Sequence, residues 1–433
     1  MVLSVVIGAI TCAALTAAVY FFPQKKIGRS SVSYYALVPL VGAIAAIVAG
    51  AVSAGRVAEY FTSAAKDNPV KIIVLFISMS LISVYLDETG FFEYAAHLAV
   101  KRTGGSQTKI FLSLYAVASV LTVVTSNDIV ILTFTPFICR FCKRCNVNAA
   151  PYVFSQFVAA NTWSMLFVIG NPTNVFLAQS TGIDFIGYLK VMWFPTLFSG
   201  LASLAILLVI FSKALKAEIR PDQDEYKLKE RPFTAVGLAY LIVCTLSVAV
   251  LPYFGLEMYY IAAACCVALF VTVIIMRAVK KQRPEIVVKT LARAPFEMIP
   301  LVLGMAIIAL SLKENGVTAK LTELIGERSV IIKYGVLSTA FSNVLNNIPM
   351  SIMFADITRG LSGASMQKAV YSTVIGSNLG AYLTPLGALA GLMFTSVLKR
   401  HGVKFGFSDF IKYGVTVVPA TLAAGLFGLY LSL

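Results

Sequence analysis

The segment Val124 to Pro136, VTSNDIVILTFTP, places three consecutive polar residues, Ser126, Asn127 and Asp128, in a very apolar part of the chain. An ionisable side chain is costly in hydrocarbon, so an acid at such a place indicates a functional site. A second polar interruption, SNVLNNIP at 342–349, occurs in the other half. Two breaks at corresponding places in two halves are the best sequence indication of a transporter's binding site.

The composition around these breaks is that of a polytopic membrane protein. The 433 residues are 58% hydrophobic and only 13% charged, against roughly 25% charged in an average soluble domain. The net charge of +15 comes from basic residues clustered in short loops between apolar runs, as the positive-inside rule produces. We therefore expect an integral protein of a prokaryotic inner (plasma) membrane with a lipid environment and no nucleic-acid partner. Seven cysteines, an odd number, do not suggest a disulfide framework.

Apolar runs of about the length that spans a bilayer occur near 2–22, 34–55 and 70–86. The first lacks a basic n-region and exceeds a usual signal-peptide core, so it predicts an uncleaved span with its N-terminus outside. Residues 90–108 carry several charges and predict an interfacial helix.

The first half then contains two irregular features. Ile110–Val124 and Ile129–Ile138 are each too short to span, and together they predict a re-entrant helical hairpin with the 126–128 polar residues at its tip. Tyr152–Ile169 predicts a helix that breaks at Gly170-Asn171-Pro172-Thr173-Asn174, where Pro172 removes a backbone donor. A long apolar run follows at 184–211.

The middle of the chain predicts two ordinary spans, near 233–251 and 258–276, between two charged loops. The loops, 212–232 and 277–293, are rich in lysine and arginine, so both are expected on the cytoplasmic side.

The second half repeats the first. An apolar run at 300–312 precedes a short pair, 330–341 and 348–357, around Asn346-Asn347, and 369–383 leads to a break at Thr384-Pro385-Leu386-Gly387-Ala388. Asn161 precedes Gly170 by nine residues, and Asn378 precedes Gly387 by nine. We expect an all-α fold of two inverted repeats, divided into 1–60 (N-terminal spans), 61–211 (first repeat), 212–295 (cytoplasmic loops and a central helix pair) and 296–433 (second repeat). Inversion would bring the breaks together near the midplane, with helix N-termini facing an anion and free carbonyls facing a cation.

These motifs resemble those of a known superfamily. Ser126-Asn127-Asp128, with Pro136 nine residues after Asn127, resembles the Ser-Asn-Thr hairpin motif of the divalent anion/sodium symporters, and 170–174 resembles their Gly-Thr-Pro-Pro-Asn break. Asp128, the 346–349 stretch NNIP and Ser377-Asn378-Leu379-Gly380 are closer to the arsenical pump membrane proteins. Both families belong to the ion transporter superfamily, which also includes citrate and silicic-acid carriers, and the similarity covers roughly 70–433.

The resemblance implies a scaffold and a transport part that moves in an elevator manner, usually in a homodimer. It also implies two cation sites. The first would use Ser126, Asn127 and the loop of Gly170, Asn171, Pro172, Thr173 and Asn174; the second would use Asn346, Asn347 and the loop with Thr384, Pro385 and Gly387. The chain departs from the symporters at Asp128, where they carry Thr, and lacks their second Ser-Asn-Thr and Pro-Pro-Asn, so the coupling ion is left open between H⁺ and Na⁺.

Asp128 is the candidate coupling residue. A carboxylate in this position can exchange a proton, or bind a cation while it stays charged; alternatively, Asn127 or Asp128 caps the following helix. The amides of Asn127, Asn171, Asn174, Asn346, Asn347 and Asn378, with Ser377 beside them, can donate and accept. They suit a neutral hydroxylated solute, a cation or an anion, or they satisfy one another and the broken backbone.

Other polar residues carry weaker hypotheses. Glu88 and Glu314 match across the repeats as interfacial caps or coupling residues, and Asp356 is expected to pair structurally with Arg359. Cys139, Cys142 and Cys145 form CxxCxxC, and thiolates are soft ligands that could capture trivalent arsenic or a soft metal. With no histidine or fourth cysteine beside them, an incidental interfacial group is favoured, and neither a metal site nor another cofactor is expected.

The functional hypothesis is an ion-coupled secondary transporter, with proton-coupled efflux of arsenite-, antimonite- or silicic-acid-like oxyacids as its most specific form. The alternative is sodium-coupled symport of di- or tricarboxylates, such as citrate or succinate, or of sulfate. An intramembrane enzyme would need a nucleophile–base set, and no such motif occurs; a channel would not need paired hairpins. No GxxxxGK[ST] motif is present, so any ATP drive would come from a separate ATPase subunit.

Overall fold

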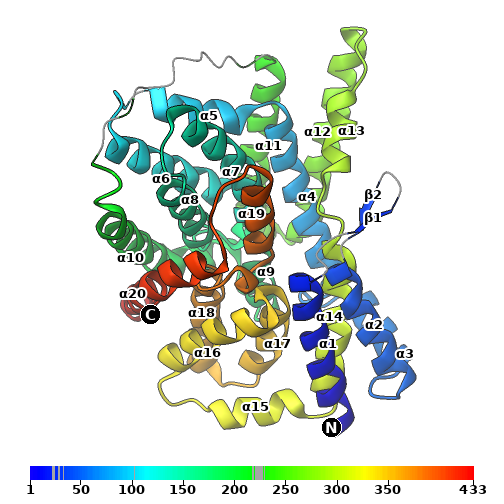
Figure 1. Ribbon diagram of the computed structural model, residues 1–433. Helices are drawn as coiled ribbons and strands as arrows, with labels where there is room; N and C mark the ends of the chain where they lie inside the picture. The colour runs from blue at the N-terminus through cyan, green and yellow to red at the C-terminus, as the bar shows by residue number, and fades with distance from the viewer. Residues whose placement is uncertain are drawn as a thin grey trace.

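The computed structural model describes residues 1–21, 25–27, 30–32, 34–101, 103–216, 219, 228 and 230–433. Most of the basic loop expected at 212–232 therefore lies outside the described residues. Helices dominate the described part, with one short antiparallel strand pair (Figure 1). The first repeat and the segments before it comprise α1 (Val2–Phe21), β1 (Lys25–Ile27), β2 (Ser30–Val32), α2 (Tyr34–Val48), α3 (Ala54–Thr62), α4 (Pro69–Glu88), α5 (Phe91–Lys101), α6 (Gln107–Val124), α7 (Asn127–Cys145), α8 (Ala150–Trp163), η1 (Val168–Gly170), α9 (Pro172–Ser180) and α10 (Phe185–Phe211).

The rest of the chain continues the helical pattern. It comprises α11 (Arg231–Val250), η2 (Leu251–Phe254), α12 (Met258–Val279), α13 (Glu285–Ala292), α14 (Met298–Glu314), α15 (Val317–Ile325), α16 (Val330–Leu345), α17 (Asn347–Arg359), α18 (Gly363–Gly380), η3 (Pro385–Gly387), α19 (Leu389–Arg400) and α20 (Phe407–Ser432).

Within the described residues, six helices are long and apolar enough to cross a membrane, or seven if α14 and α15, bent by 77°, form one span. Only 33% of the most apolar stretch of α11 and of α12 is buried inside the protein. The remaining apolar side chains need hydrocarbon around them, which confirms the expected integral membrane protein.

Several predicted boundaries were wrong. The first hairpin has longer arms than expected, because α6 begins at Gln107 and is itself long enough to span, and α7 continues to Cys145. Helix α8 ends at Trp163, well before the expected break at Gly170. The run 34–55 is two helices, separated at Gly50, which has a φ of 72°. The loop expected at 277–293 contains the end of α12 and the short helix α13.

The two repeats run in opposite directions through the molecule. Arg293, just before α14, pairs with Asp87 at the end of α4 at 2.6 Å. At the other end of the pair, Lys313 of α14 pairs with Asp356 of α17, and Asp67, before α4, pairs with Arg359 of the same helix. Helices α4 and α14 are therefore antiparallel, which confirms the inversion.

Helices α10 and α20 are antiparallel too. The ring of Phe211, at the end of α10, lies 4.9 Å from that of Tyr413, early in α20. The ring of Phe198, nearer the start of α10, lies 5.9 Å from that of Phe427, late in α20. The last helices of the repeats thus obey the same twofold relation as the first.

The repeats also exchange elements at the centre. Helix α7, the second arm of the first hairpin, packs against α19, which follows the second break, and α17 packs against α9, which follows the first break. Figure 1 shows α5, α6 and α7 towards one end of the molecule and α15, α16 and α17 towards the other. Each hairpin therefore contacts the half-helix supplied by the other repeat.

One end of the molecule, which we call the basic end, carries the start of α11 and the end of α12. The guanidinium of Arg277 pairs with Glu230 and lies 4.1 Å from the ring centroid of Phe233. Helix α13 lies at this end, and the N-terminus and α15 lie at the opposite end (Figure 1). The basic end is the one expected in the cytoplasm.

This orientation gives a labelling test. In a variant whose seven native cysteines are replaced, we expect Arg283→Cys, near α13, to resist a membrane-impermeant maleimide added to intact cells. We expect its counterpart Lys320→Cys, on the exposed face of α15, to react. The reverse pattern, measured by gel shift, would show that the basic end faces outward.

Candidate functional site

The hairpin tips and helix breaks meet in the interior, where polar side chains replace the missing helical hydrogen bonds. Three of these segments begin with a side-chain cap: Oδ1 of Asn171 accepts from N–H of Thr173 in α9, Oδ1 of Asn346 from Ile348 in α17, and Oγ1 of Thr384 from Leu386 in η3. Helix α7 differs, because its N-cap residue Ser126 makes no side-chain capping bond.

The first break is closed by one amide. Nδ2 of Asn174 donates to the carbonyl oxygens of Ser164 at 2.8 Å and of Phe167 at 3.2 Å. These carbonyls are released where α8 ends, and hydrocarbon offers them no other donors. Asn174 therefore holds the non-helical stretch between α8 and α9 in place.

Asn378 of α18 joins this break to the second repeat. Its Oδ1 accepts from Nδ2 of Asn171 at 2.8 Å and from Oγ of Ser164 at 3.1 Å. Its Nδ2 donates to Oδ1 of Asn174 at 2.7 Å, and Oγ of Ser377 donates to Oγ1 of Thr173 at 3.4 Å. In this conformation, Asn171, Asn174 and Asn378 thus satisfy one another and the broken backbone.

The second break repeats this arrangement with different residues. Nδ2 of Asn343 donates to the carbonyl oxygens of Thr339 and Gly380, both at 2.9 Å, and its Oδ1 accepts from Oγ1 of Thr384 at 2.7 Å. Nδ2 of Asn346 donates to the carbonyl oxygen of Leu386 at 3.1 Å. The hairpin tip and the second break therefore form one bonded unit.

Two glycines let the broken backbone approach itself. A Cβ on Gly170 would lie 2.4 Å from the carbonyl oxygen of Ser164, and one on Gly387 would lie 2.7 Å from that of Gly380. Any side chain at either position would push the two backbone segments apart. Pro172 and Pro385 begin the segments that follow, at positions where a missing N–H costs nothing.

Three buried oxygen atoms at the hairpin tips have no partner among the described residues: Oγ of Ser126, Oδ1 of Asn127 and Oδ1 of Asn347. The residues are 4%, 1% and 3% exposed. The orientation of the Asn127 amide follows from its neighbour, since Nδ2 of Asn161 donates to the Phe157 carbonyl and leaves Oδ1 to accept from Nδ2 of Asn127. Asn127 and Asn347 are the first residues of α7 and α17, so the repeats relate these two oxygens.

Asp128 faces away from this network. It lines a cavity with Ser126, Glu297 and Arg293, and it makes no hydrogen bond or ion pair with any described residue. Because α7 lacks a side-chain cap, the hypothesis that Asn127 or Asp128 serves as one is wrong for this conformation.

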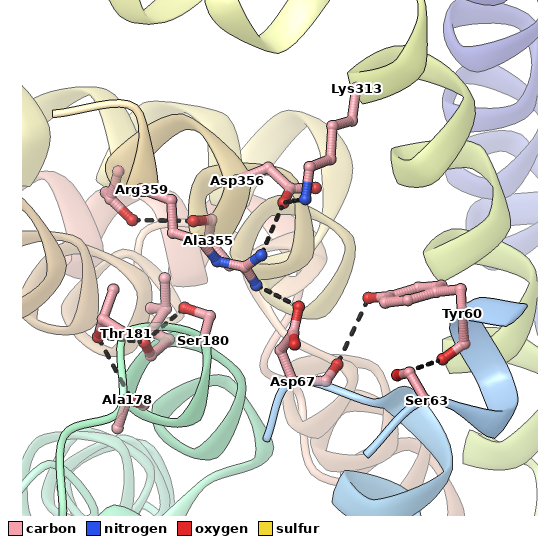
Figure 2. Close-up of polar contacts among 12 residues, drawn as sticks. Tyr60, Ser63, Asp67, Ala178, Ser180, Thr181, Lys313, Ala355, Asp356 and Arg359 are labelled. Carbon is pink, nitrogen blue, oxygen red and sulfur yellow. Dashed lines mark hydrogen bonds and ion pairs between the residues drawn. The ribbon is translucent and has the colours of Figure 1, made fainter. Parts of the chain in front are cut away.

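Ion pairs join three helices at the end of the molecule opposite to the basic end (Figure 2). The paired residues line an open cavity of about 670 Å³. Arg359 of α17 pairs with Asp67, before α4, and lies 3.5 Å from Asp356, which is 3.1 Å from Nζ of Lys313 in α14. The expected Asp356–Arg359 pair is confirmed, but it belongs to a larger cluster that ties the second hairpin to α4 and α14.

The basic end is hollowed as well. A vestibule reaches from Lys399, Arg400 and Lys404 at its mouth to Pro385 and Leu386 at the second break. Burial and the nearby charges of Arg140 and Arg400 lower the pKa of His401 in this region. The mouth therefore favours the approach of anions.

The weaker candidates take structural positions. Glu88 pairs with Arg293, and Glu314 with Arg56 at 2.6 Å. Cys139 and Cys142 are buried, and no group of three His, Cys, Asp or Glu side chains in the described ranges could hold a metal ion.

Three residues of the network were not among the site residues predicted from the sequence: Asn161, which was noted only for its spacing, Asn343, which was noted only as part of the 342–349 interruption, and Ser164. The matched spacing of Asn161 and Asn378 to Gly170 and Gly387 was a usable signal for the first. Asn343 lies one helical turn before Asn346, so it could have been found from the hairpin pattern.

The glycine geometry gives a stability prediction. We expect Gly170→Ala to cost about 1–3 kcal/mol of unfolding free energy, because its Cβ meets backbone rather than a movable side chain. Gly55→Ala, on α3 with nothing within 4 Å, should be neutral or stabilise by about 0.5–1 kcal/mol. Thermal melting in detergent measures both, and equal melting temperatures would contradict the close approach.

Comparisons with known proteins agree with this architecture. The arsenical pump membrane protein of Escherichia coli strain K12 is 26% identical over 413 residues, which cover 91% of this chain and 92% of that protein. A 46 kDa membrane protein of Mycobacterium leprae is 26% identical, covering 83% of this chain and 85% of its own. The crystal structure of the YdaH transporter of Alcanivorax borkumensis shares the fold, with a TM-score of 0.58, 14% identity, and coverage of 99% of this chain and 97% of that one.

The family itself is shown by a direct match. The citrate transporter family model matches residues 30–371, which is most of the chain. This agrees with the resemblance to the ion transporter superfamily, and the bacterial relatives together with the apolar spans indicate a prokaryotic plasma membrane. The protein therefore belongs to the citrate transporter family and is an integral membrane transporter.

Proposed function

We propose that the protein is a secondary transporter that exports small oxyacids in their protonated form, with arsenite and antimonite as model substrates, in exchange for protons. The observation that carries this is the pair of unpartnered amide oxygens on Asn127 and Asn347. An amide oxygen only accepts hydrogen bonds, and a buried acceptor without a donor costs about 1–3 kcal/mol. Trivalent arsenic and antimony hydroxides are uncharged near neutral pH and carry several O–H donors that would meet these oxygens.

The charge of the interior supports an uncharged solute. Among the described residues, Arg277 is the only buried Lys, Arg or His, and it lies at the basic end, away from the hairpin tips. A citrate or succinate dianion would need cationic partners, since burying an uncompensated charge is far more costly than burying a hydroxyl group. The Ser, Thr and Asn lining of the breaks suits hydroxyl groups better.

The access routes support movement between two sides. One vestibule opens at the basic end, and a second cavity, lined by the Asp67–Arg359 cluster, opens at the other. We assign the hairpins and broken helices to a transport part, and α2, α4 and α14 to a scaffold. Elevator movement of the transport part would break the ion pairs that Arg359 forms with Asp67 and that Asp356 forms with Lys313. A homodimer and a separate ATPase subunit are extensions of this proposal, taken from the family resemblance.

One observation favours the alternative, sodium-coupled uptake of a carboxylate or sulfate. Helices α7 and α17 begin at the hairpin tips, and α9 and α19 begin at the breaks. Helix N-termini attract anions by about 0.3–1 kcal/mol each. The orphan amide oxygens would then bind Na⁺. Transport assays distinguish proton-coupled export of oxyacids from sodium-coupled uptake of a carboxylate or sulfate.

The first test concerns substrate. Wild-type protein in inside-out vesicles should accumulate arsenite or antimonite when a pH gradient is imposed, without Na⁺. Asn127→Ala and Asn347→Ala should each lower this transport about tenfold, the equivalent of one lost hydrogen bond near 1.4 kcal/mol. Asn148→Ala, in the exposed segment before α8, is the matched control for a lost amide, because it removes one bond at the start of that helix, from N–H of Ala150 to Oδ1 of Asn148, and none at the hairpin tips. Na⁺-dependent citrate, succinate or sulfate transport without arsenite transport would favour the alternative.

The second test concerns coupling. Asp128→Asn keeps the size of the side chain but removes its titration, so uphill transport should fall at least tenfold while substrate exchange across the membrane persists. Glu323→Gln, an exposed acid on α15, should leave both unchanged. Uphill transport and substrate exchange are both measured in proteoliposomes with imposed pH or Na⁺ gradients. Full pH-driven uphill transport by Asp128→Asn would contradict a proton role.

A further inference from the structure

Basic residues surround the mouth of the vestibule, and the transport of an uncharged solute gives them no role. Lys399, Arg400 and Lys404 line this mouth, and all three are exposed. None of them forms an ion pair with a residue that the structure describes. Among the described residues of the vestibule wall, Asp409 is the one acid, and it caps the start of α20. The mouth therefore carries more positive than negative charge, and this excess attracts an anion other than the proposed substrate.

The end of α7 adds a fourth cation beside this mouth. Helix α7 packs along α19, and the charges of Lys143 on α7 and Arg400 on α19 both lower the pKa of His401. Lys143 is exposed and forms no ion pair with a described residue, whereas Arg140, one turn earlier, pairs with Glu93 at 2.5 Å. The ends of the two helices thus form one basic patch, which consists of Lys143, Lys399, Arg400 and Lys404.

The basic patch lies at the height of the lipid headgroups. Helices α7 and α19 both begin at the centre of the molecule, at a hairpin tip and a break, and the relation between inverted repeats places that centre near the membrane midplane. At a rise of about 1.5 Å per residue, the end of α19 lies about 18 Å from its start, and Lys143 lies about 24 Å from the start of α7. The headgroup layer extends from about 15 to about 22 Å from the midplane.

The vestibule wall below the basic patch is apolar, which indicates the kind of anion that fits. Leu392, Met393 and Phe405 line this wall. Phe407, close in sequence to Lys404, lines it too and is 40% exposed. Exposed apolar side chains beside lysine and arginine are typical of a surface that inserts between lipids. An inorganic anion would use only the charges, whereas a phospholipid would use the charges for its phosphate and the apolar wall for an acyl chain.

We propose that the basic patch binds the phosphate group of an anionic phospholipid, with an acyl chain against the apolar wall of the vestibule. Because α7 and α19 belong to the transport part, the lipid holds that part where the patch lies at the membrane surface. Elevator movement takes the four cations out of the headgroup layer, so anionic lipid slows this step. The lipid site itself does not depend on which substrate the protein carries.

The binding test uses purified protein in a neutral detergent, with native mass spectrometry to count bound lipid. Wild type should retain dioleoylphosphatidylglycerol and release dioleoylphosphatidylcholine. The triple variant Lys399→Gln/Arg400→Gln/Lys404→Gln should bind phosphatidylglycerol at least about tenfold more weakly, because each cation near the surface adds to the attraction of anionic lipid. Lys399→Arg/Lys404→Arg keeps every charge and should bind as wild type does.

The matched control is Lys281→Gln/Arg283→Gln/Lys289→Gln, which removes three exposed cations near α13, at the same end of the molecule but outside the basic patch. It should retain phosphatidylglycerol as wild type does, and melting and gel filtration of each variant exclude misfolding. Equal retention of the two lipids by wild type, or an equal loss in the control and the patch variant, would overturn the proposal. Displacement of the lipid by inorganic phosphate, at an ionic strength at which chloride does not displace it, would overturn the lipid as the ligand.

The effect on movement is measured as arsenite exchange in proteoliposomes. Wild type and the control variant should exchange arsenite more slowly in phosphatidylglycerol than in phosphatidylcholine, and the patch variant should exchange it at the same rate in both. Equal wild-type rates in the two lipids would overturn the regulatory role. Absence of arsenite exchange in every lipid would overturn the proposed substrate, while lipid retention in the mass spectrometer would still support the site.

Discussion

The structure depends on one constraint: backbone that leaves a helix inside a membrane must find its hydrogen bonds within the protein. Asparagine side chains meet this need at both breaks, because each amide donates and accepts at once. Asn174 holds the carbonyls freed at the end of α8, and Asn343 holds those freed beside α18. Asn378 then ties the two repeats together through three side-chain bonds, to Ser164, Asn171 and Asn174. The central amides are therefore structural elements first.

This constraint separates the atoms that hold the fold from those left for a ligand. Once the broken backbone is satisfied, three buried oxygens at the hairpin tips, on Ser126, Asn127 and Asn347, still lack a partner among the described residues. Inverted symmetry places two of them at equivalent positions, at the first residue of α7 and of α17. The central network thus satisfies the broken backbone but leaves these symmetric oxygens at the tips without a donor. That is the arrangement expected of a binding site held by a rigid surrounding shell.

Much of this organisation could be predicted from the sequence, because its signals were local. The polar residues at 126–128 and 346–347, the prolines at 172 and 385, and the repeated order of apolar runs identified the hairpins, the breaks and the repeats. The helix ends could not be predicted as well, because Trp163 and Gly380 end their helices in response to tertiary partners. The pairing of α7 with α19, and the meeting of Arg359 with Asp67, join segments far apart in sequence. No periodicity in the sequence carries that information.

The ion pairs also differ between the helices assigned to the scaffold and the hairpins assigned to the transport part. Ion pairs such as Lys71–Glu257 lie between α4 and α12, outside the broken helices and hairpins. Those that join the hairpins to the rest of the chain lie near the two ends, as with Arg359–Asp67 and Arg140–Glu93. Partly exposed pairs of this kind contribute about 0–1 kcal/mol each, so they can be exchanged during movement at little cost. Between these ends, Asp128 forms no ion pair with any residue that the structure describes. A charge left unpaired in that position makes the energy of the hairpin sensitive to whether a cation is bound, which is the physical requirement for coupling ion binding to conformational change.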